Sequence, residues 1–497
     1  MRSLVILLLL VLTLLTSLES VPPNYAAIPI TGEPEPGMES YDRIIPSFMA
    51  KYDVLGGAVA VIKNGSLVFA RGYGYANTES RLPVQPYSLF RIASLSKQFT
   101  AVTILKLVEE HRLSLDDKAF SILNIQPAKE GKVQDPRIAD ITIRELLEHS
   151  GGWDRDTTFD PMFIPYTIAK ALGTDAPPSR EAIIQYMLTQ PLQFSPGTKY
   201  AYSNFGYLLL GRIIEKVTGE QYENYVQRNV LAGLGITDMR MGHTQLAFAA
   251  PDEVHYYDYP GAQPVESVFP NITKHVPDPY GGFYLEDMDS HGGWIASAVD
   301  IARFAASVDG SIPPSFISPA MIREMTARPP APLWVGSDHW YGLGWLIRPV
   351  TSTGSNWWHT GSLSGTMTIV VRASDGVVWA ALFNTRPKNS DNAFTDLDNS
   401  LWDARKGITA WPTHNLFLPS NPTTKAPSTI LETSLQMTSA RATRNQRNVT
   451  TTATASSYGV FVKFRLLVLS DSFSPTPGSD IMVRFHTASS SDKRSCV

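Results

Sequence analysis

The sequence predicts an α+β fold: an antiparallel sheet built from both ends of one domain, flanked by helices, with a helical lobe inserted between them. Two hairpin signals, Asn64-Gly65 and Asp375-Gly376, each lie between two apolar runs, as expected of tight turns between antiparallel strands. The region from about 113 to 280 has helical and loop character with no clear strand. A cleft between a sheet and such a lobe is a usual substrate site.

The first elements expected are a helix, two strands and a second helix. Apolar residues recur at helical spacing from Ile44 to Tyr52, although Pro46 is unfavourable inside a helix. The two runs beside Asn64-Gly65 are apolar enough for strands, and a helix running to about Glu110 follows. Further helices are expected at 141–149, 180–188, 204–217 and around 394–404, and further strands at 341–347, 366–373 and 377–383.

Ser94 and Lys97 stand at the head of the helix that runs to Glu110. Residues three apart share a helix face, and this face continues through small and apolar side chains. A serine hydroxyl needs a neighbouring base, and a lysine amine can serve only if burial lowers its pKa from about 10.4. The pattern alone is weak evidence, because Ser490 and Lys493 repeat it in the tail. The alternative is a helix cap followed by a surface lysine.

Both ends of the chain differ from the middle. Residues 1–20 combine Arg2, an apolar run and small polar residues, as in a secretory signal peptide. An uncleaved leader that anchors the chain is the alternative. We expect a catalytic domain over 38–408 and a Ser/Thr-rich, disordered tail over 412–497, in which 460–469 resembles a lone strand. The sequence predicts a secreted or otherwise exported protein with no membrane span in the mature chain.

Export is compatible with three N-glycosylation acceptors, at Asn64, Asn271 and Asn448. Asn64 also suits the hairpin turn, and the two interpretations are compatible.

Composition excludes several classes of function. Charged residues make up 18% of 497 and the net charge is -4, so nothing indicates a nucleic-acid partner. The single cysteine excludes an internal disulfide framework and a cysteine-built metal site. No His-Glu-x-x-His cluster, complete dinucleotide motif or Gly-x-Ser-x-Gly elbow occurs. We therefore expect no metal and no cofactor, and a small-molecule or peptide substrate as the partner; the oligomeric state is open.

Two motifs downstream of Ser94 complete an ordered set. Tyr202-x-Asn204 lies on a loop that enters the helix at 204–217, after a turn marked by Pro196-Gly197. His359-Thr360-Gly361-Ser362 follows Trp357-Trp358 and leads toward the sheet.

Together with Ser94-x-x-Lys97, these motifs resemble the beta-lactamase-related serine hydrolases, the family of class C beta-lactamases, DD-peptidases, D-aminopeptidases and esterases. The segments 141–152 and 292–304 add weaker similarity, and the likeness runs from about 38 to 408. The resemblance implies a beta-lactamase/transpeptidase-like fold.

The resemblance also implies residue roles. Ser94 would form an acyl-enzyme, while Lys97 and a Tyr202 acidified by nearby positive charge would share proton transfer. Asn204 would hydrogen-bond substrate or Lys97. The backbone N–H groups of Ser94 and Ser362 would form the oxyanion hole, with Gly361 beside it.

Four tryptophans near the motifs could line an apolar acyl pocket: Trp153, Trp294, Trp357 and Trp358.

His359 departs from the family pattern, because beta-lactamases and DD-peptidases usually carry lysine there to bind a substrate carboxylate. A histidine near pKa 6.5 is mostly neutral at pH 7. This favours a serine hydrolase acting on esters, small amides or peptides. A true beta-lactamase or DD-carboxypeptidase is the alternative among enzymes, and a non-catalytic binding or scaffold protein is the alternative of another class.

Overall fold

The computed structural model describes residues 28–125, 135–269, 274–313, 315–351, 354–418 and two short strands near 460. The chain divides into two compact units, Met1–Asn421 and Pro422–Val497. In the second unit the described residues form an antiparallel pair, β15 (Thr454–Ser457) with β16 (Val460–Lys463). The lone strand expected at 460–469 is therefore paired over its first residues. The start of the tail predicted to be disordered, 412–418, is ordered: the Leu416 N–H donates to the Leu67 carbonyl oxygen, and the Arg303 guanidinium lies over the Phe417 ring. The predicted leader and the remainder of the tail outside β15 and β16 lie outside the described residues.

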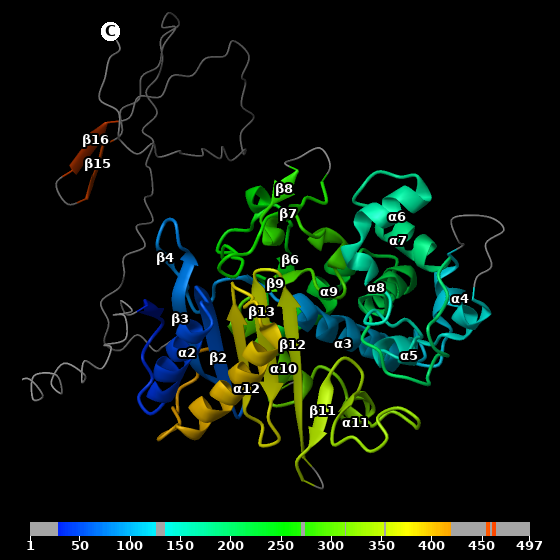
Figure 1. Cartoon of the computed structure of the whole chain (residues 1–497). Coiled ribbons are helices and arrows are strands. Elements are labelled where there is room, and N and C mark those ends of the chain that lie inside the picture. The colour runs from blue at the N-terminus through cyan, green and yellow to red at the C-terminus, as the bar shows by residue number, and fades with distance from the viewer. Residues whose placement is uncertain are drawn as a thin grey trace, which may run out of the picture. The chain divides into compact units, whose positions relative to one another are not determined.

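A nine-stranded antiparallel sheet organises the first unit, and it joins strands from both ends of the domain as predicted. N-terminal β2 pairs with C-terminal β14, so sequence-distant segments meet at the centre of the sheet (Figure 1). In spatial order the strands are β1 (Ile30–Thr31), β3 (Ser66–Asn77), β2 (Gly56–Lys63), β14 (Val378–Phe383), β13 (Thr366–Arg372), β12 (Ser355–Leu363), β11 (Leu346–Pro349) and β10 (Trp340–Tyr341), with β4 (Leu82–Pro83) paired to β3.

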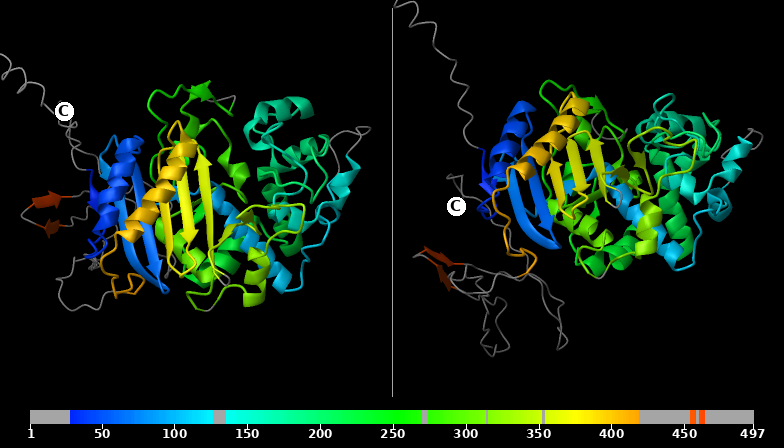
Figure 2. Two further views of the ribbon diagram at one scale, coloured as in Figure 1. Left: turned by 60° about the horizontal axis from the view of Figure 1, so that its bottom comes forward. Right: turned by 90° about the horizontal axis from the view of Figure 1, so that it is seen from below.

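The two faces of the sheet are covered by different helices. On β14, Trp379 and Phe383 point toward α2 (Glu39–Lys51) and α12 (Ser390–Lys406), which lie together on one face (Figure 1, Figure 2). The alternate residues Ala380 and Leu382 belong to the larger core on the other face, with α10 (Ala298–Val308). A strand's side chains alternate between faces, and burial of both faces explains why the central strands are almost wholly apolar.

The helical lobe packs alongside α3 (Ser96–Glu109) on the side away from β2 and β3, and it is built by the middle of the chain (Figure 1). Its longest helix, α8, begins at Asn204 behind the N-cap Ser203, whose side chain accepts from the Gly206 N–H. The helices of this region are α4 (Ala119–Leu123), α5 (Ile143–Leu147), α6 (Pro165–Leu172), α7 (Arg180–Met187), α8 (Asn204–Thr218) and α9 (Tyr222–Val226), and α11 (Pro319–Thr326) follows α10.

Two strand predictions were wrong. The described part of the middle region contains three two-residue strands, too short to show alternation: β6 (Arg240–Met241), β7 (Val265–Glu266) and β8 (His275–Val276). The single strand expected over 341–347 is instead the hairpin of β10 and β11. Gly344 turns this hairpin at φ +88°, and a Cβ there would lie 2.5 Å from that of Ala101. The segment Gly342–Gly344, predicted as part of a strand, is therefore a turn that packs on α3.

The turn at Asn64-Gly65 is confirmed. Both residues have positive φ, 49° and 75°, which is the conformation of a two-residue type I′ hairpin. Asn64 is exposed, whereas Asn271 and Asn448 lie outside the described residues. Within the described residues, no helix is both long and apolar enough to cross a bilayer.

Candidate active site

Ser94 lies in a short 3-10 turn, Ala93–Leu95, immediately before α3. Ala93 has a φ of +48°, a left-handed conformation that is unfavourable for a residue with a Cβ. The turn packs against β12, where Gly361 faces it. A Cβ on Gly361 would lie 2.4 Å from the carbonyl oxygen of Ile92. Only glycine at 361 therefore lets the strand approach the Ser94 turn this closely.

Lys97 is wholly buried, one turn beyond Ser94, and its Nζ has three polar neighbours. Nζ lies 3.1 Å from Ser94 Oγ, 2.8 Å from Asn204 Oδ1 and 2.8 Å from the carbonyl oxygen of His291. Burial lowers the pKa of Lys97 well below its usual value, and the charge of Arg155 lowers it further. The head of α3 therefore carries a lysine that favours the neutral amine.

The neighbours of Lys97 fit a neutral amine. Asn204 Nδ2 donates to the carboxylate of Asp160 at 2.6 Å, which leaves Oδ1 facing Lys97. That oxygen and the His291 carbonyl can only accept hydrogen bonds. A neutral amine has two hydrogens and one lone pair. With both hydrogens on these acceptors, a neutral Lys97 would accept a hydrogen bond from the Ser94 hydroxyl, whereas a protonated Lys97 donates to Ser94 Oγ.

Tyr202 is half-buried beside Ser94 and hydrogen-bonds to it. Lys97 Nζ lies 4.8 Å from the centre of its ring, and the Arg155 guanidinium 4.6 Å. Burial raises the pKa of Tyr202, although the Ser94 hydrogen bond and the Arg155 charge oppose the rise. The expectation of an acidified tyrosine was therefore wrong in sign, because desolvation of the phenolate outweighs one guanidinium.

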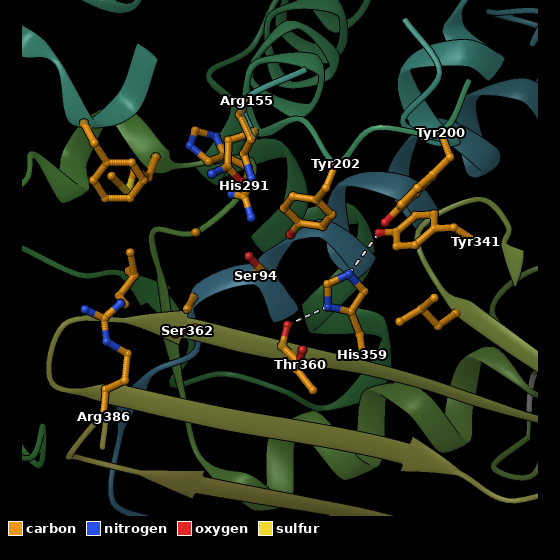
Figure 3. A pocket seen from close by; sticks show the side chains of 17 residues that line it. Ser94, Arg155, Tyr200, Tyr202, His291, Tyr341, His359, Thr360, Ser362 and Arg386 are labelled. Atoms are coloured by element: carbon orange, nitrogen blue, oxygen red, sulfur yellow. Dashed lines mark hydrogen bonds between the residues drawn. The ribbon is translucent and has the colours of Figure 1, made fainter. Parts of the chain in front are cut away.

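His359 lies on β12 and both its nitrogens are bonded within the protein. Nδ1 is 2.7 Å from the Thr360 carbonyl oxygen, an acceptor, so Nδ1 carries the hydrogen. Nε2 then accepts from the hydroxyl of Tyr341 at 2.9 Å (Figure 3). Burial lowers the pKa of His359 to about 3. The ring is neutral at pH 7, as expected, and has no free N–H for a substrate carboxylate.

These side chains line one cavity of about 450 Å³ at the head of α3 (Figure 3). The sequence prediction placed Ser94, Tyr202, Asn204, His359 and Ser362 in a common site, and all five line this cavity. Lys97 and Gly361 lie directly behind it. All four tryptophans near the motifs lie elsewhere: the cavity is lined by the residues Ala93, Ser94, Arg155, Phe163, Tyr200, Tyr202, Asn204, Met288, His291, Gly292, Tyr341, Leu346, His359, Thr360, Ser362, Leu363 and Arg386.

The sequence reasoning missed Arg155 and Asp160. Asp160 accepts a hydrogen bond from Asn204 and lies 3.3 Å from a guanidinium nitrogen of Arg155. It therefore connects Asn204, which contacts Lys97, to Arg155, which lies over the Tyr202 ring. Both come from a loop without a motif, and no spacing in the sequence would have indicated them.

His149 was also missed as a site residue, although it lies in a segment with family similarity. Its buried ring packs 4.3 Å from that of Tyr202, and Nδ1 accepts from the Ser203 N–H at 3.1 Å. Its φ of +58° marks a constrained backbone. His149 therefore positions the Tyr202 loop from behind.

Comparison with known proteins assigns the family. Residues 41–399 match the family described as Beta-lactamase. The chain belongs to the beta-lactamase family. It is 26% identical over 321 residues to penicillin-binding protein 4* of Bacillus subtilis (strain 168), covering 64% of this chain and 65% of that one. The matched region spans between 60% and 74% of the length of three curated relatives.

Solved structures have the same beta-lactamase/transpeptidase-like fold. The octameric penicillin-binding protein homologue from Pyrococcus abyssi is 27% identical with a TM-score of 0.55, over 75% of this chain and 78% of that one. The D-amino acid amidase from Ochrobactrum anthropi SV3 is 22% identical with a TM-score of 0.56, over 74% of this chain and 99% of that one.

Proposed function

We propose that the chain is a serine hydrolase that acts through an acyl-enzyme at Ser94 on esters, small amides or peptides. The observation that carries this proposal is the buried Lys97 amine 3.1 Å from Ser94 Oγ, with two other acceptors for its hydrogens. Such a lysine activates a serine without an additional base.

The chemical steps follow from this arrangement. Ser94 Oγ bonds to the substrate carbonyl carbon as Lys97 takes the hydroxyl proton, and the bond from that carbon to the leaving atom breaks. The raised pKa of Tyr202 keeps its phenol protonated, so Tyr202 donates a proton to the leaving atom and recovers one from Lys97. Water then attacks the carbonyl carbon of the ester on Ser94, and its proton passes through the same two side chains to Ser94 Oγ as the bond from that carbon to Oγ breaks.

The backbone N–H groups of Ser94 and Ser362 are our candidates for the oxyanion hole. Ser362 is exposed to the cavity and stands next to Gly361, the residue packed against the Ser94 turn. Two preorganised N–H donors would stabilise the negative charge that develops on the carbonyl oxygen.

A fluorophosphonate probe tests the proposal, with the adduct located by peptide mass spectrometry. We expect a single adduct on Ser94 and none in Ser94→Ala. A folded wild-type protein without an adduct would favour the scaffold alternative. Rates with p-nitrophenyl esters, D-amino-acid amides and nitrocefin would then separate the enzyme classes. Rapid nitrocefin turnover would favour a true beta-lactamase and contradict our interpretation of His359.

We also propose that the chain is exported, that residues 1–20 are a cleaved leader and that 38–408 form the catalytic domain. Among the acceptor triplets, Asn64 is exposed at a hairpin tip. N-terminal sequencing of secreted protein and a glycosidase-dependent mass change, absent in Asn64→Gln, test these points. An intact leader on all the protein would support the membrane-anchor alternative.

A further inference from the structure

The charge of the cavity wall is one-sided. Its lining includes two guanidinium groups, Arg155 and Arg386, and no aspartate or glutamate. His359 is neutral, and Lys97 favours the neutral form. Since the surrounding protein lowers the local dielectric, a guanidinium without an ion pair attracts anionic ligands strongly.

The two arginines differ in whether a carboxylate is paired with the guanidinium. Arg155 has carboxylate partners, Asp160 at 3.3 Å and Asp156 at 3.7 Å. Arg386 forms no ion pair within the described chain; its Nη2 donates to Ser364 Oγ at 3.1 Å, and that hydroxyl donates to Asp278. Burial raises the pKa of Asp258 and the Arg386 charge opposes the rise, so Asp258 lies near Arg386 without forming an ion pair with it. Ser364 therefore orients Arg386 and leaves the remaining N–H groups of its guanidinium for a ligand.

The position of Arg386 separates it from the place of the usual family lysine. On β12, His359 lies three residues before Ser362, and Ser362 is opposite Met367, which is opposite Phe383 on β14. Arg386 lies three residues beyond Phe383, past the other end of the strands. Figure 3 shows the same arrangement, with Tyr202 and His359 on one side of Ser94 and Arg386 on the other.

This arrangement assigns the two halves of a substrate. In the mechanism proposed above, Tyr202 protonates the leaving atom, so the leaving group lies on the Tyr202 side of Ser94. The acyl group then extends to the opposite side, toward Arg386. Phe163, Met288 and Leu363 line the cavity together with Arg386, and they provide apolar surface for the acyl chain.

We propose that Arg386 is an anion subsite that recognises a carboxylate at the far end of the acyl group, so that the preferred substrates are half-esters or half-amides of dicarboxylic acids. This inference rests on the proposed acyl-enzyme mechanism only for the direction of the acyl group. A planar guanidinium with unused N–H groups binds a carboxylate in a bidentate, charge-assisted manner.

The test compares two substrates that differ only at the terminal group: 4-nitrophenyl hexanoate and mono-4-nitrophenyl adipate. Longer half-esters of the same series, each compared with its neutral alkanoate ester, test which chain length places the carboxylate at Arg386. After subtraction of spontaneous hydrolysis, we expect kcat/KM of wild type to be higher for a half-ester than for its neutral counterpart. Arg386→Gln should lower that value about 10- to 100-fold and leave the neutral ester within about threefold. Arg386→Lys should retain part of the preference.

Lys388→Gln is the matched control, because it removes the same charge two residues away from an exposed side chain outside the cavity lining. It should leave both substrates unchanged. Equal losses on charged and neutral esters in Arg386→Gln, or no half-ester preference in wild type at any length, would overturn the anion subsite while leaving Ser94 catalysis intact.

A binding experiment separates failure of the subsite from failure of the catalytic proposal. Calorimetry with folded Ser94→Ala should show dicarboxylate half-amides binding about 10-fold or more tightly than matched neutral amides, and the double variant with Arg386→Gln should lose the difference. Equal binding would overturn the subsite. Absence of a Ser94 adduct in wild type, with the binding difference preserved, would overturn only the catalytic proposal.

Discussion

Replacing Lys97 by methionine removes the proposed base and keeps an unbranched side chain of similar length. Loss of a positioned general base costs about 10²- to 10⁴-fold in rate, equivalent to about 2.7 to 5.4 kcal/mol of activation free energy. We expect the rate constant for phosphonylation of Ser94 to fall within this range in Lys97→Met.

The effect of Lys97→Met on stability should be much smaller. Asn204 Oδ1 and the His291 carbonyl oxygen lose a donor, at about 1 to 3 kcal/mol each. Removal of a wholly buried amine offsets part of this cost, because its desolvation no longer opposes folding. We expect the free energy of unfolding to change by less than about 3 kcal/mol, and the variant to stay folded.

The assay is the time course of fluorophosphonate labelling, read together with thermal denaturation of the same samples. Lys106→Met is the matched control: it is on the same helix, half-buried, and faces Phe316 outside the cavity lining. It should label at the wild-type rate. If Lys97→Met is folded and labels within about threefold of wild type, our assignment of the base is wrong, since a general base contributes far more.

Three further predictions concern single residues. Burial raises the pKa of Glu148 from 4.5 to about 7. Between these two pH values the native state therefore binds more protons than the unfolded state, and the free energy of unfolding falls as the pH rises. Glu148→Gln should stabilise the protein by about 1 to 3 kcal/mol near pH 8 and not near pH 4, by thermal denaturation; an equal effect at both values would refute this. Gly361→Ala should destabilise the protein by about 1 to 3 kcal/mol and slow the labelling of Ser94, because the new Cβ would collide with the carbonyl oxygen of Ile92. An unchanged melting temperature and labelling rate would contradict this packing argument. His359→Gln should keep the acidic limb of the pH–rate profile, because the histidine is already neutral above about pH 3; a shifted limb would show that His359 titrates during turnover.

The parts of the fold predictable from sequence are those encoded by local patterns. The Asn64-Gly65 turn was recognisable because a type I′ hairpin needs two residues that tolerate positive φ. Helix α8 was recognisable from its apolar spacing. The β10–β11 hairpin was missed. Gly344 packs so closely against α3 that a Cβ on it would lie 2.5 Å from that of Ala101. That contact is tertiary and leaves no local signature.

The same distinction applies to the site. Ser94 and Lys97 were predicted as a pair because three-residue spacing on a helix is a local fact. The roles of Asp160 and Arg386 depend on which charges the fold leaves paired or unpaired, and this has no sequence period. The pKa of Tyr202 was predicted with the wrong sign for the same reason, since burial was unknown.

The pH dependence of Ser94 phosphonylation tests most directly whether Lys97 is an uncharged base. Because burial lowers the pKa of Lys97 well below its usual value, the labelling rate should rise much less than tenfold per pH unit between pH 7 and 9. A rate that rises about tenfold per pH unit over that range, as for a lysine of ordinary pKa near 10.4, would contradict the mechanism.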